Sequence, residues 1–145
     1  MKAIYIPYAV EIDPETRFQV LSAMDRHGNV LAVVSEASLE SAEKELIELL
    51  LHLLGAEASK GHDRFGDLFD SALDGPCVTL SPTQVIPIRL KLARAQANLR
   101  QADMAGLLGI TQQTYAKMER PGSNPTLQTL ALVERALGRD LLCWV

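Results

Sequence analysis

Hydrophobic and polar residues alternate over three segments near the N-terminus, as expected for strands that bury one face. These segments are 3–12, 17–24 and 30–34, and the turn-forming sequence DRHGN separates the second from the third. Pro7, inside the first segment, predicts an edge strand or a bulge. The segment 76–80 is predicted to be a short fourth strand. We therefore predict that the first three strands form an antiparallel meander.

A helical pattern follows the third strand, from Ser38, which can cap a helix, to about Leu54. Its apolar residues recur at helical spacing but also extend well around the cylinder, farther than one sheet face can cover. We predict a deeply buried core helix in which His52 is packed among leucines or capped. In the alternative, the excess leucines contact a second chain.

An aspartate occurs at every third or fourth position of the segment 62–75. On a helix, Asp63, Asp67, Asp70 and Asp74 would share one face, with phenylalanine and leucine side chains on the other. The oxygen ligands of a metal ion must converge, whereas a straight helix directs these carboxylates apart. We therefore predict a solvated acidic face, with an acidic surface for a basic partner as the alternative.

The pattern changes after residue 80. Residues 81–87, SPTQVIP, contain two prolines and are predicted to be a linker. Short helices are then predicted at 88–98 and at about 101–108. Gly109 is typical of a helix C-terminus, and Thr111 can cap the next helix. The result is a helix, a turn of three residues and a second helix.

Charge is distributed unevenly along the chain. Residues 1–81 contain 6 Lys+Arg and 14 Asp+Glu, a net charge of −8, and residues 82–145 contain 8 and 4, a net charge of +4. This asymmetry predicts two domains with a boundary between residues 81 and 82. We predict an α+β chain, with a small α/β domain followed by an all-α domain. Any contact with nucleic acid is expected in the basic half.

The composition supports a folded protein, because 48% of the residues are hydrophobic. No apolar run approaches the roughly 20 residues that cross a bilayer, and the N-terminus lacks a signal-peptide pattern. We therefore expect a cytoplasmic protein without a membrane partner. Cys77 and Cys143 have no CxxC spacing and are expected to be reduced apolar residues.

The helix after Thr111 has two unlike faces. At about 100° per residue, five residues fall within one arc, opposite Tyr115 and Met118. Those five are Gln112, Gln113, Ala116, Lys117 and Arg120. Glutamine can bond to both N6 and N7 of adenine, and lysine or arginine can reach guanine or phosphate. An ordinary solvent-exposed helix face would show the same pattern of polar residues, but the surrounding sequence favours a DNA-reading helix.

The stretch RQADMAGLLGITQQTYAKMERPGSNPTLQTLALVERALG, residues 100–138, resembles the helix-turn-helix of the Cro and phage-repressor (Xre) family. The resemblance implies a lambda-repressor-like fold, a phosphate contact from Gln101, and backbone contacts from the loop with Ser123 and Asn124. Arg100 replaces the usual capping Ser or Thr, which would cost about 1 kcal/mol, although its side chain could contact a phosphate instead. The candidate DNA-binding residues are Arg94, Arg100, Gln101, Thr111, Gln112, Gln113, Lys117, Arg120, Ser123 and Asn124.

A helix-turn-helix domain of this size has a weak footprint alone, so we expect a homodimer or higher oligomer that reads a palindromic operator. The apolar tail RDLLCWV, residues 139–145, is expected to pack within the domain or pair with a second copy. Leu107 is expected to be covered or to mark a domain that is marginally stable alone.

The whole chain is similar to the longer HicB-family antitoxins. The resemblance rests on AIYIPYAVEI, SEASLESAEKELIELLLHLL, CVTL and VIPIRLKLARAQ. It implies a partial ribonuclease-H-like N-terminal domain that neutralises a small basic mRNA-cleaving toxin, HicA-like, and a C-terminal domain that represses the operon. The net charge of −8 suits a basic partner. The alternative is a stand-alone regulator whose N-terminal domain oligomerises or senses a ligand.

Catalysis is not expected. Two-metal chemistry needs several carboxylates on neighbouring strands, and the segments 17–24 and 30–34 contain none. The three histidines have no metal-ligand spacing, and the chain has neither a glycine-rich phosphate loop nor a GxSxG motif. We predict no catalytic residues, no metal and no cofactor.

Overall fold

The computed structural model describes residues 3–139. This part of the chain forms two compact units. The N-terminal unit contains residues 3–54 and 64–80, and the C-terminal unit contains residues 55–63 and 81–139. The division differs from a single boundary after residue 81, because residues 55–63 belong to the C-terminal unit.

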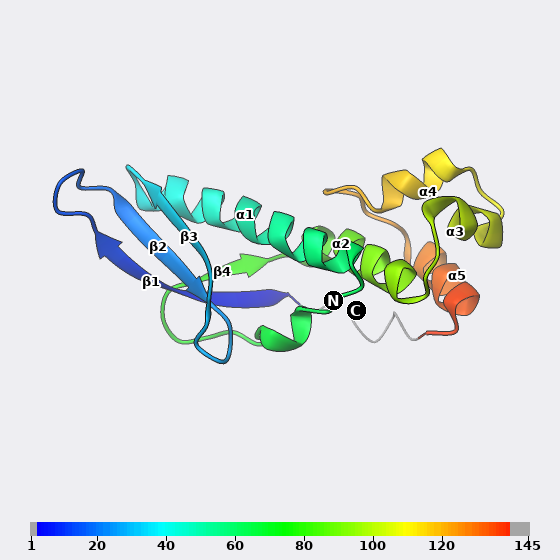
Figure 1. The fold of residues 1–145 in the computed structure, drawn as a ribbon, viewed down its shortest axis with the longest axis horizontal. Coiled ribbons are helices and arrows are strands. Elements are labelled where there is room, and N and C mark those ends of the chain that lie inside the picture. The colour runs from blue at the N-terminus through cyan, green and yellow to red at the C-terminus, as the bar shows by residue number, and fades with distance from the viewer. Residues whose placement is uncertain (1–2, 140–145) are drawn as a thin grey trace. The chain divides into compact units, whose positions relative to one another are not determined.

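A four-stranded antiparallel sheet forms the N-terminal unit (Figure 1). Its strands are β1 (Ile4–Ile12), β2 (Gln19–Met24), β3 (Val30–Glu36) and β4 (Cys77–Leu80), in the order β3-β2-β1-β4. The predicted meander and the fourth strand are confirmed. The edge-strand prediction for β1 is wrong, since β1 lies between β2 and β4. Pro7 is tolerated because β2 begins to pair with β1 only at Tyr8.

Helix α1 (Leu39–Ser59) covers one face of the sheet (Figure 1). The Ser38 hydroxyl caps it by accepting a hydrogen bond from Ser41 N at 3.2 Å. The prediction of a deeply buried helix is wrong. Only residues four apart along one stripe are fully buried, while Leu39, Leu49 and His52 are exposed. The buried stripe consists of Ala42, Leu46, Leu50, Leu54 and Ala58.

Residues 62–75 do not form the predicted helix. They contain one short 3-10 helix, η1 (Phe65–Asp67), so the four aspartates share no helical face. Nearby backbone carbonyls bond instead to the sheet and its turn, because Tyr5 N donates to Phe69 O and Arg26 N to Asp67 O, both at 2.8 Å. These bonds replace those that a helix would make within itself.

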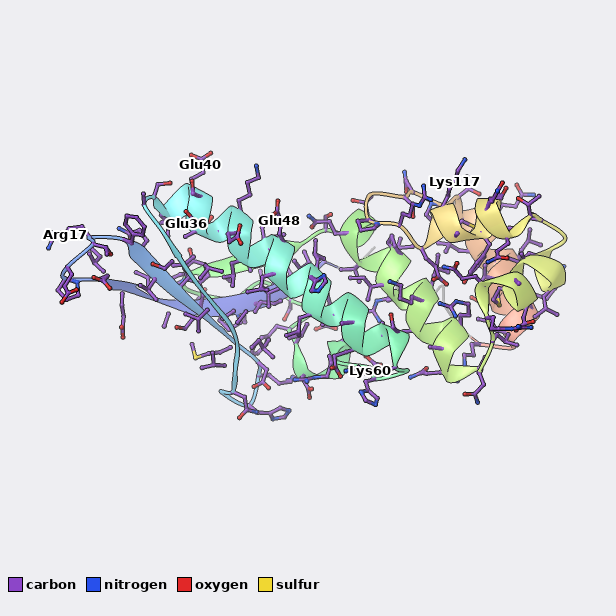
Figure 2. The ribbon with its side chains drawn as sticks, turned by 45° about the horizontal axis from the view of Figure 1, so that its top comes forward. Arg17, Glu36, Glu40, Glu48, Lys60 and Lys117 are labelled. Carbon is purple, nitrogen blue, oxygen red and sulfur yellow. The ribbon has the colours of Figure 1, made fainter. Side chains whose placement is uncertain are left out.

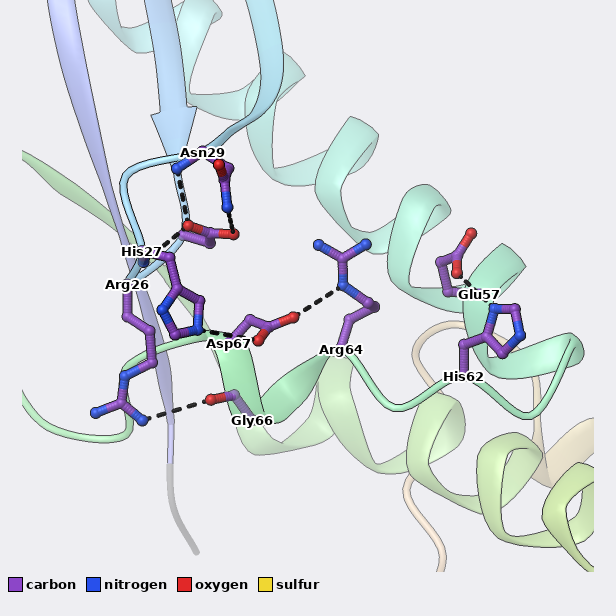
Figure 3. Close-up of polar contacts among 9 residues, drawn as sticks. Arg26, His27, Asn29, Glu57, His62, Arg64, Gly66 and Asp67 are labelled. Carbon is purple, nitrogen blue, oxygen red and sulfur yellow. Dashed lines mark hydrogen bonds and ion pairs between the residues drawn. The ribbon is translucent and has the colours of Figure 1, made fainter.

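The side chains around Asp67 join this loop to the turn between β2 and β3 (Figure 3). The Asp67 carboxylate accepts a hydrogen bond from Arg64 Nε at 3.1 Å and lies 3.4 Å from His27 Nε2. Arg26 places its guanidinium over the Phe69 ring, 5.6 Å from the centroid. Asp67 is therefore a contact of the fold rather than part of an acidic face.

Four helices form the rest of the C-terminal unit: α2 (Pro82–Gln96), α3 (Gln101–Leu108), α4 (Gln112–Met118) and α5 (Leu127–Leu137). The linker prediction for 81–87 is wrong, because α2 begins at Pro82. Proline is favoured at the first helical position, and Gln84 Oε1 accepts a hydrogen bond from Ser81 N at 2.8 Å. Pro87 lies buried inside the same helix.

One apolar core joins these helices. Its buried members are Ile86, Leu90, Ala93, Met104, Ala105, Tyr115, Leu130 and Val133. The loop after α1 also belongs to this unit, since Gln96 Nε2 donates to Gly61 O at 3.3 Å. Leu107 is exposed, so no described residue covers it. The prediction for the tail, residues 139–145, concerns its packing or pairing. These residues lie outside the described part of the chain, apart from Arg139.

No helix among residues 3–139 is long and apolar enough to cross a membrane.

Candidate nucleic-acid interface

Helices α3 and α4 are joined by a sharp turn over residues 109–111. Gly109 ends α3 in the left-handed conformation, with φ of 68°, and Ile110 N donates to Ala105 O at 3.0 Å. Thr111 then caps α4, because its hydroxyl accepts a hydrogen bond from Thr114 N at 3.1 Å. The predicted helix end at Gly109 and the predicted cap at Thr111 are both confirmed, and together they set the direction of α4.

The start of α3 keeps part of its cap despite Arg100. The Asp103 carboxylate accepts a hydrogen bond from the backbone N–H of Arg100 at 2.8 Å, which is half of a capping box. The Arg100 side chain, 85% exposed, also pairs with Asp103 at 3.3 Å. Hydrogen bonds from Arg100 lower the pKa of Asp103. The expected loss of the cap is therefore partly compensated.

The outer face of α4 carries an open hollow, here called the reading face. Six residues line it: Thr111, Gln112, Gln113, Ala116, Lys117 and Arg120. Five of them are exposed, and Ala116 is half-buried. Lys117 points outward from α4 (Figure 2). The small alanine leaves room at the middle of the face, between amides and cations.

Tyr115 anchors the opposite side of α4. It is fully buried in the core of the C-terminal unit, and Met118 packs against that core. The Tyr115 hydroxyl is buried beside the Glu119 carboxylate, and burial raises the pKa of Tyr115. Because one side of α4 is held in the core, the reading face is presented outward.

Glu119, at the C-terminal end of α4, is a buried carboxylate that sequence reasoning missed. It accepts hydrogen bonds from Arg94 Nε at 2.6 Å, Arg94 Nη2 at 3.1 Å and Gln101 Nε2 at 3.1 Å. Burial alone would raise the pKa of Glu119, but the bonds from Arg94 and Gln101 outweigh burial and lower it. This network joins α2, α3 and α4.

The network changes the interpretation of Arg94. The sequence makes Arg94 a candidate DNA-binding residue, but its guanidinium binds Glu119 and also donates to Leu99 O at 2.8 Å. Its side chain is only 15% exposed. The structure therefore gives Arg94 a positioning role within the helix-turn-helix instead of a free phosphate contact. Hydrophobic periodicity contains no signal for this pair, since both residues are charged and lie 25 positions apart.

The remaining predicted residues flank the reading face. Gln101 begins α3, half-buried, with its amide bound to Glu119. The Ser123 hydroxyl donates to Met118 O at 2.6 Å, which fixes the loop after α4, and Asn124 is exposed in that loop. Contacts of these groups with the DNA backbone stay a prediction of the Xre resemblance. Among residues 3–139, no three His, Cys, Asp or Glu side chains gather as a metal site requires.

The geometry of α3, the turn and α4 defines a helix-turn-helix. Residues 90–142 match the helix-turn-helix family, a span that begins within α2 and includes α3, α4 and α5. The Xre/Cro-type resemblance is thereby confirmed for this part of the chain. The match supports a DNA-binding transcriptional regulator of the Xre type. A comparison of the chain with curated proteins found no match.

Proposed function

We propose that the chain is the antitoxin of a toxin-antitoxin pair and represses its own operon by reading operator DNA through the reading face. One observation supports the DNA part most strongly. The same six residues that line the hollow on α4 have the chemistry of base-edge and phosphate recognition. The capped turn and the buried network present this face as a rigid unit.

Each part of the reading face has a chemical role in this proposal. Gln112 and Gln113 each supply a donor and an acceptor, the pair that adenine N7 and N6 require in the major groove. Ala116 allows the helix to approach closely. Lys117 and Arg120 supply cations for guanine or phosphate. Arg100 and Asn124 add contacts to the backbone beside the groove.

The DNA contact is tested with the double variant Gln112→Ala, Gln113→Ala. Each lost bidentate pair should weaken binding to DNA from upstream of the gene by about 1–3 kcal/mol, measured by fluorescence anisotropy. The matched control is Gln128→Ala, which removes an exposed glutamine of α5 outside the reading face. Equal operator affinity in the double variant and the control would show that another surface reads the DNA.

The antitoxin part rests on the HicB resemblance and on charge. The N-terminal 81 residues carry a net charge of −8, and Glu40 and Glu48 of α1 point away from the sheet (Figure 2). Such a surface favours a small basic partner, HicA-like in the proposal. The partial ribonuclease-H-like fold belongs to the same proposal, as does a binding role without catalysis.

The alternative is a stand-alone regulator whose N-terminal unit oligomerises or senses a ligand. Purification of the chain from its native host separates the two. A small basic protein that co-purifies, and is encoded beside this gene, supports the antitoxin. A chain that purifies without such a protein, and has no such neighbour, supports the stand-alone regulator. In both cases we expect a homodimer, because one small module has a weak footprint and a palindrome needs two.

A further inference from the structure

The strand β3 lies at an open edge of the sheet. In the described part of the chain, β3 pairs with β2 on one side and with no strand on the other. Val30 is 59% exposed and Val33 is 54% exposed. Glu36, at the end, is its one charged residue. Folded proteins usually protect such apolar edges with charges, proline or a covering element, since an open edge is a template for another strand.

The hydrogen bonds at the two ends of β2 show which of its backbone N–H and C=O groups point toward β3. Asp13 N donates to Phe18 O, and Asp25 N donates to Asn29 O. Backbone groups alternate along a strand, so the odd-numbered residues of β2 face β3. Ala32 and Val34 pair with Ala23 and Leu21 and face β2. The N–H and C=O groups of Val33 and Ser35 therefore face the open edge.

We infer that this edge binds β3 of a second copy of the chain, in an antiparallel arrangement about a two-fold axis at Val33. In this register Val33 lies opposite Val33 of the second copy, and Ala32 lies opposite Val34. Glu36 lies opposite Val30, so no like charges meet. Position 33 is the midpoint of the seven residues 30–36, so a two-fold axis there pairs the whole strand with its copy. The bulge near Met24 interrupts the register with β2, and only residues 32–36 pair with β2 in regular register.

A competing edge lies on β1, where β4 pairs only with residues 4–7. Val10 and Ile12 are exposed there. However, this stretch contains Glu11 and leads into Asp13 and Glu15. Pairing of two copies there would bring carboxylates together, which destabilises a strand pair. The charge pattern therefore favours β3 over this stretch of β1 for self-association.

The inference deepens the homodimer of the proposed function and does not depend on the DNA contact. The test measures the mass of the full chain without DNA, by light scattering after size exclusion. The wild type should be a dimer of the 15.9 kDa chain. Val33→Pro removes the outward N–H, which an edge strand tolerates, and should convert the dimer to a monomer. Val33→Thr keeps the N–H and should remain dimeric.

A cross-linking experiment decides the register and covers the case in which Val33→Pro fails to fold. In a chain with Cys77→Ser and Cys143→Ser, Val33→Cys should form an intermolecular disulfide. Opposed Cα atoms in a hydrogen-bonded pair are about 5.5 Å apart, within disulfide range. The matched control, Val30→Cys, is equally exposed but lies opposite Glu36, and should not cross-link. A monomeric wild type, a folded Val33→Pro dimer, or equal cross-linking at both positions would overturn the inference.

Discussion

The buried pair of Arg94 and Glu119 determines how the DNA-binding helices are held. Glu119 is 5% exposed and forms bonds to two other helices. Two charges removed from water are stable only when they satisfy each other. Glu119 thus positions α4 from its C-terminal end, while Thr111 positions it from its N-terminal end. Neither contact uses a residue of the exposed Gln112 and Gln113 pair.

Glu119→Gln should lower the free energy of unfolding by roughly 3 kcal/mol, because it leaves the Arg94 guanidinium buried without its counter-charge. The double variant Arg94→Met, Glu119→Leu should recover most of this loss, since it removes both charges. Urea unfolding followed by circular dichroism measures both. A double variant as unstable as Glu119→Gln would show that the pair is held for a different reason.

The same pair predicts a pH dependence. The pKa of Glu119 is lowered in the folded chain, so its contribution is present above the ordinary glutamate pKa of about 4.3. That contribution is lost as the pH falls through the folded pKa. The difference in unfolding free energy between wild type and Glu119→Gln should therefore be largest near neutral pH and shrink below about pH 4.3. A constant difference down to pH 3 would contradict the lowered pKa.

At the scale of elements, the turn between α3 and α4 depends on backbone conformation more than on contacts. Gly109 has φ of 68°, and a Cβ added there would meet no atom within 4 Å. Gly106, inside α3, also has open space around an added Cβ, but its φ is not positive. The two glycines therefore differ in conformation and not in packing.

This difference makes a matched pair of variants. Gly109→Ala should destabilise the chain by about 1 kcal/mol, because an alanine resists the left-handed conformation. Gly106→Ala should stabilise it by about 0.5–1 kcal/mol, because glycine is unfavourable inside a helix. Thermal unfolding of both variants beside the wild type measures the sign. Two shifts of the same sign would refute the assignment of strain to the turn.

At the scale of the whole molecule, the two halves of the chain carry net charges of opposite sign. Residues 82–145 carry a net charge of +4, although the complete chain is acidic with a net charge of −4. Attraction to DNA arises from the cations near the reading face and weakens as salt replaces the released counterions. The acidic N-terminal part is suited to a partner of the opposite charge.

Arg100→Ala should reduce the slope of log affinity against log salt concentration by about 1, the value for one lost phosphate contact. Arg94→Met should change stability, with a smaller effect on the slope, because Arg94 is bound to Glu119. Anisotropy titrations at several salt concentrations measure the slope. An unchanged slope in Arg100→Ala would show that this exposed cation does not reach a phosphate.

Much of this organisation follows from local patterns. The alternation of hydrophobic and polar residues predicted the strands, because successive side chains of a strand point to opposite faces of the sheet. Gly109 and Thr111 predicted the turn between α3 and α4, because of their backbone and capping preferences. The predictions for two segments were wrong for related reasons. Residues 62–75 have a helical pattern, but their backbone groups bond to β1 and the β2–β3 turn. Residues 81–87 have two prolines, but one begins α2 and the other is buried within it.

The sequence was sufficient for the helix-turn-helix and for the direction of its reading face, because both depend on residues within one short stretch. Only the tertiary structure showed the role of Arg94, since its partner is 25 residues away and both side chains are charged. The open edge of β3 also required the fold, because strand order depends on pairing between distant segments. Local chemistry determines how each element forms, and the packing of distant elements determines which of its groups remain free to bind.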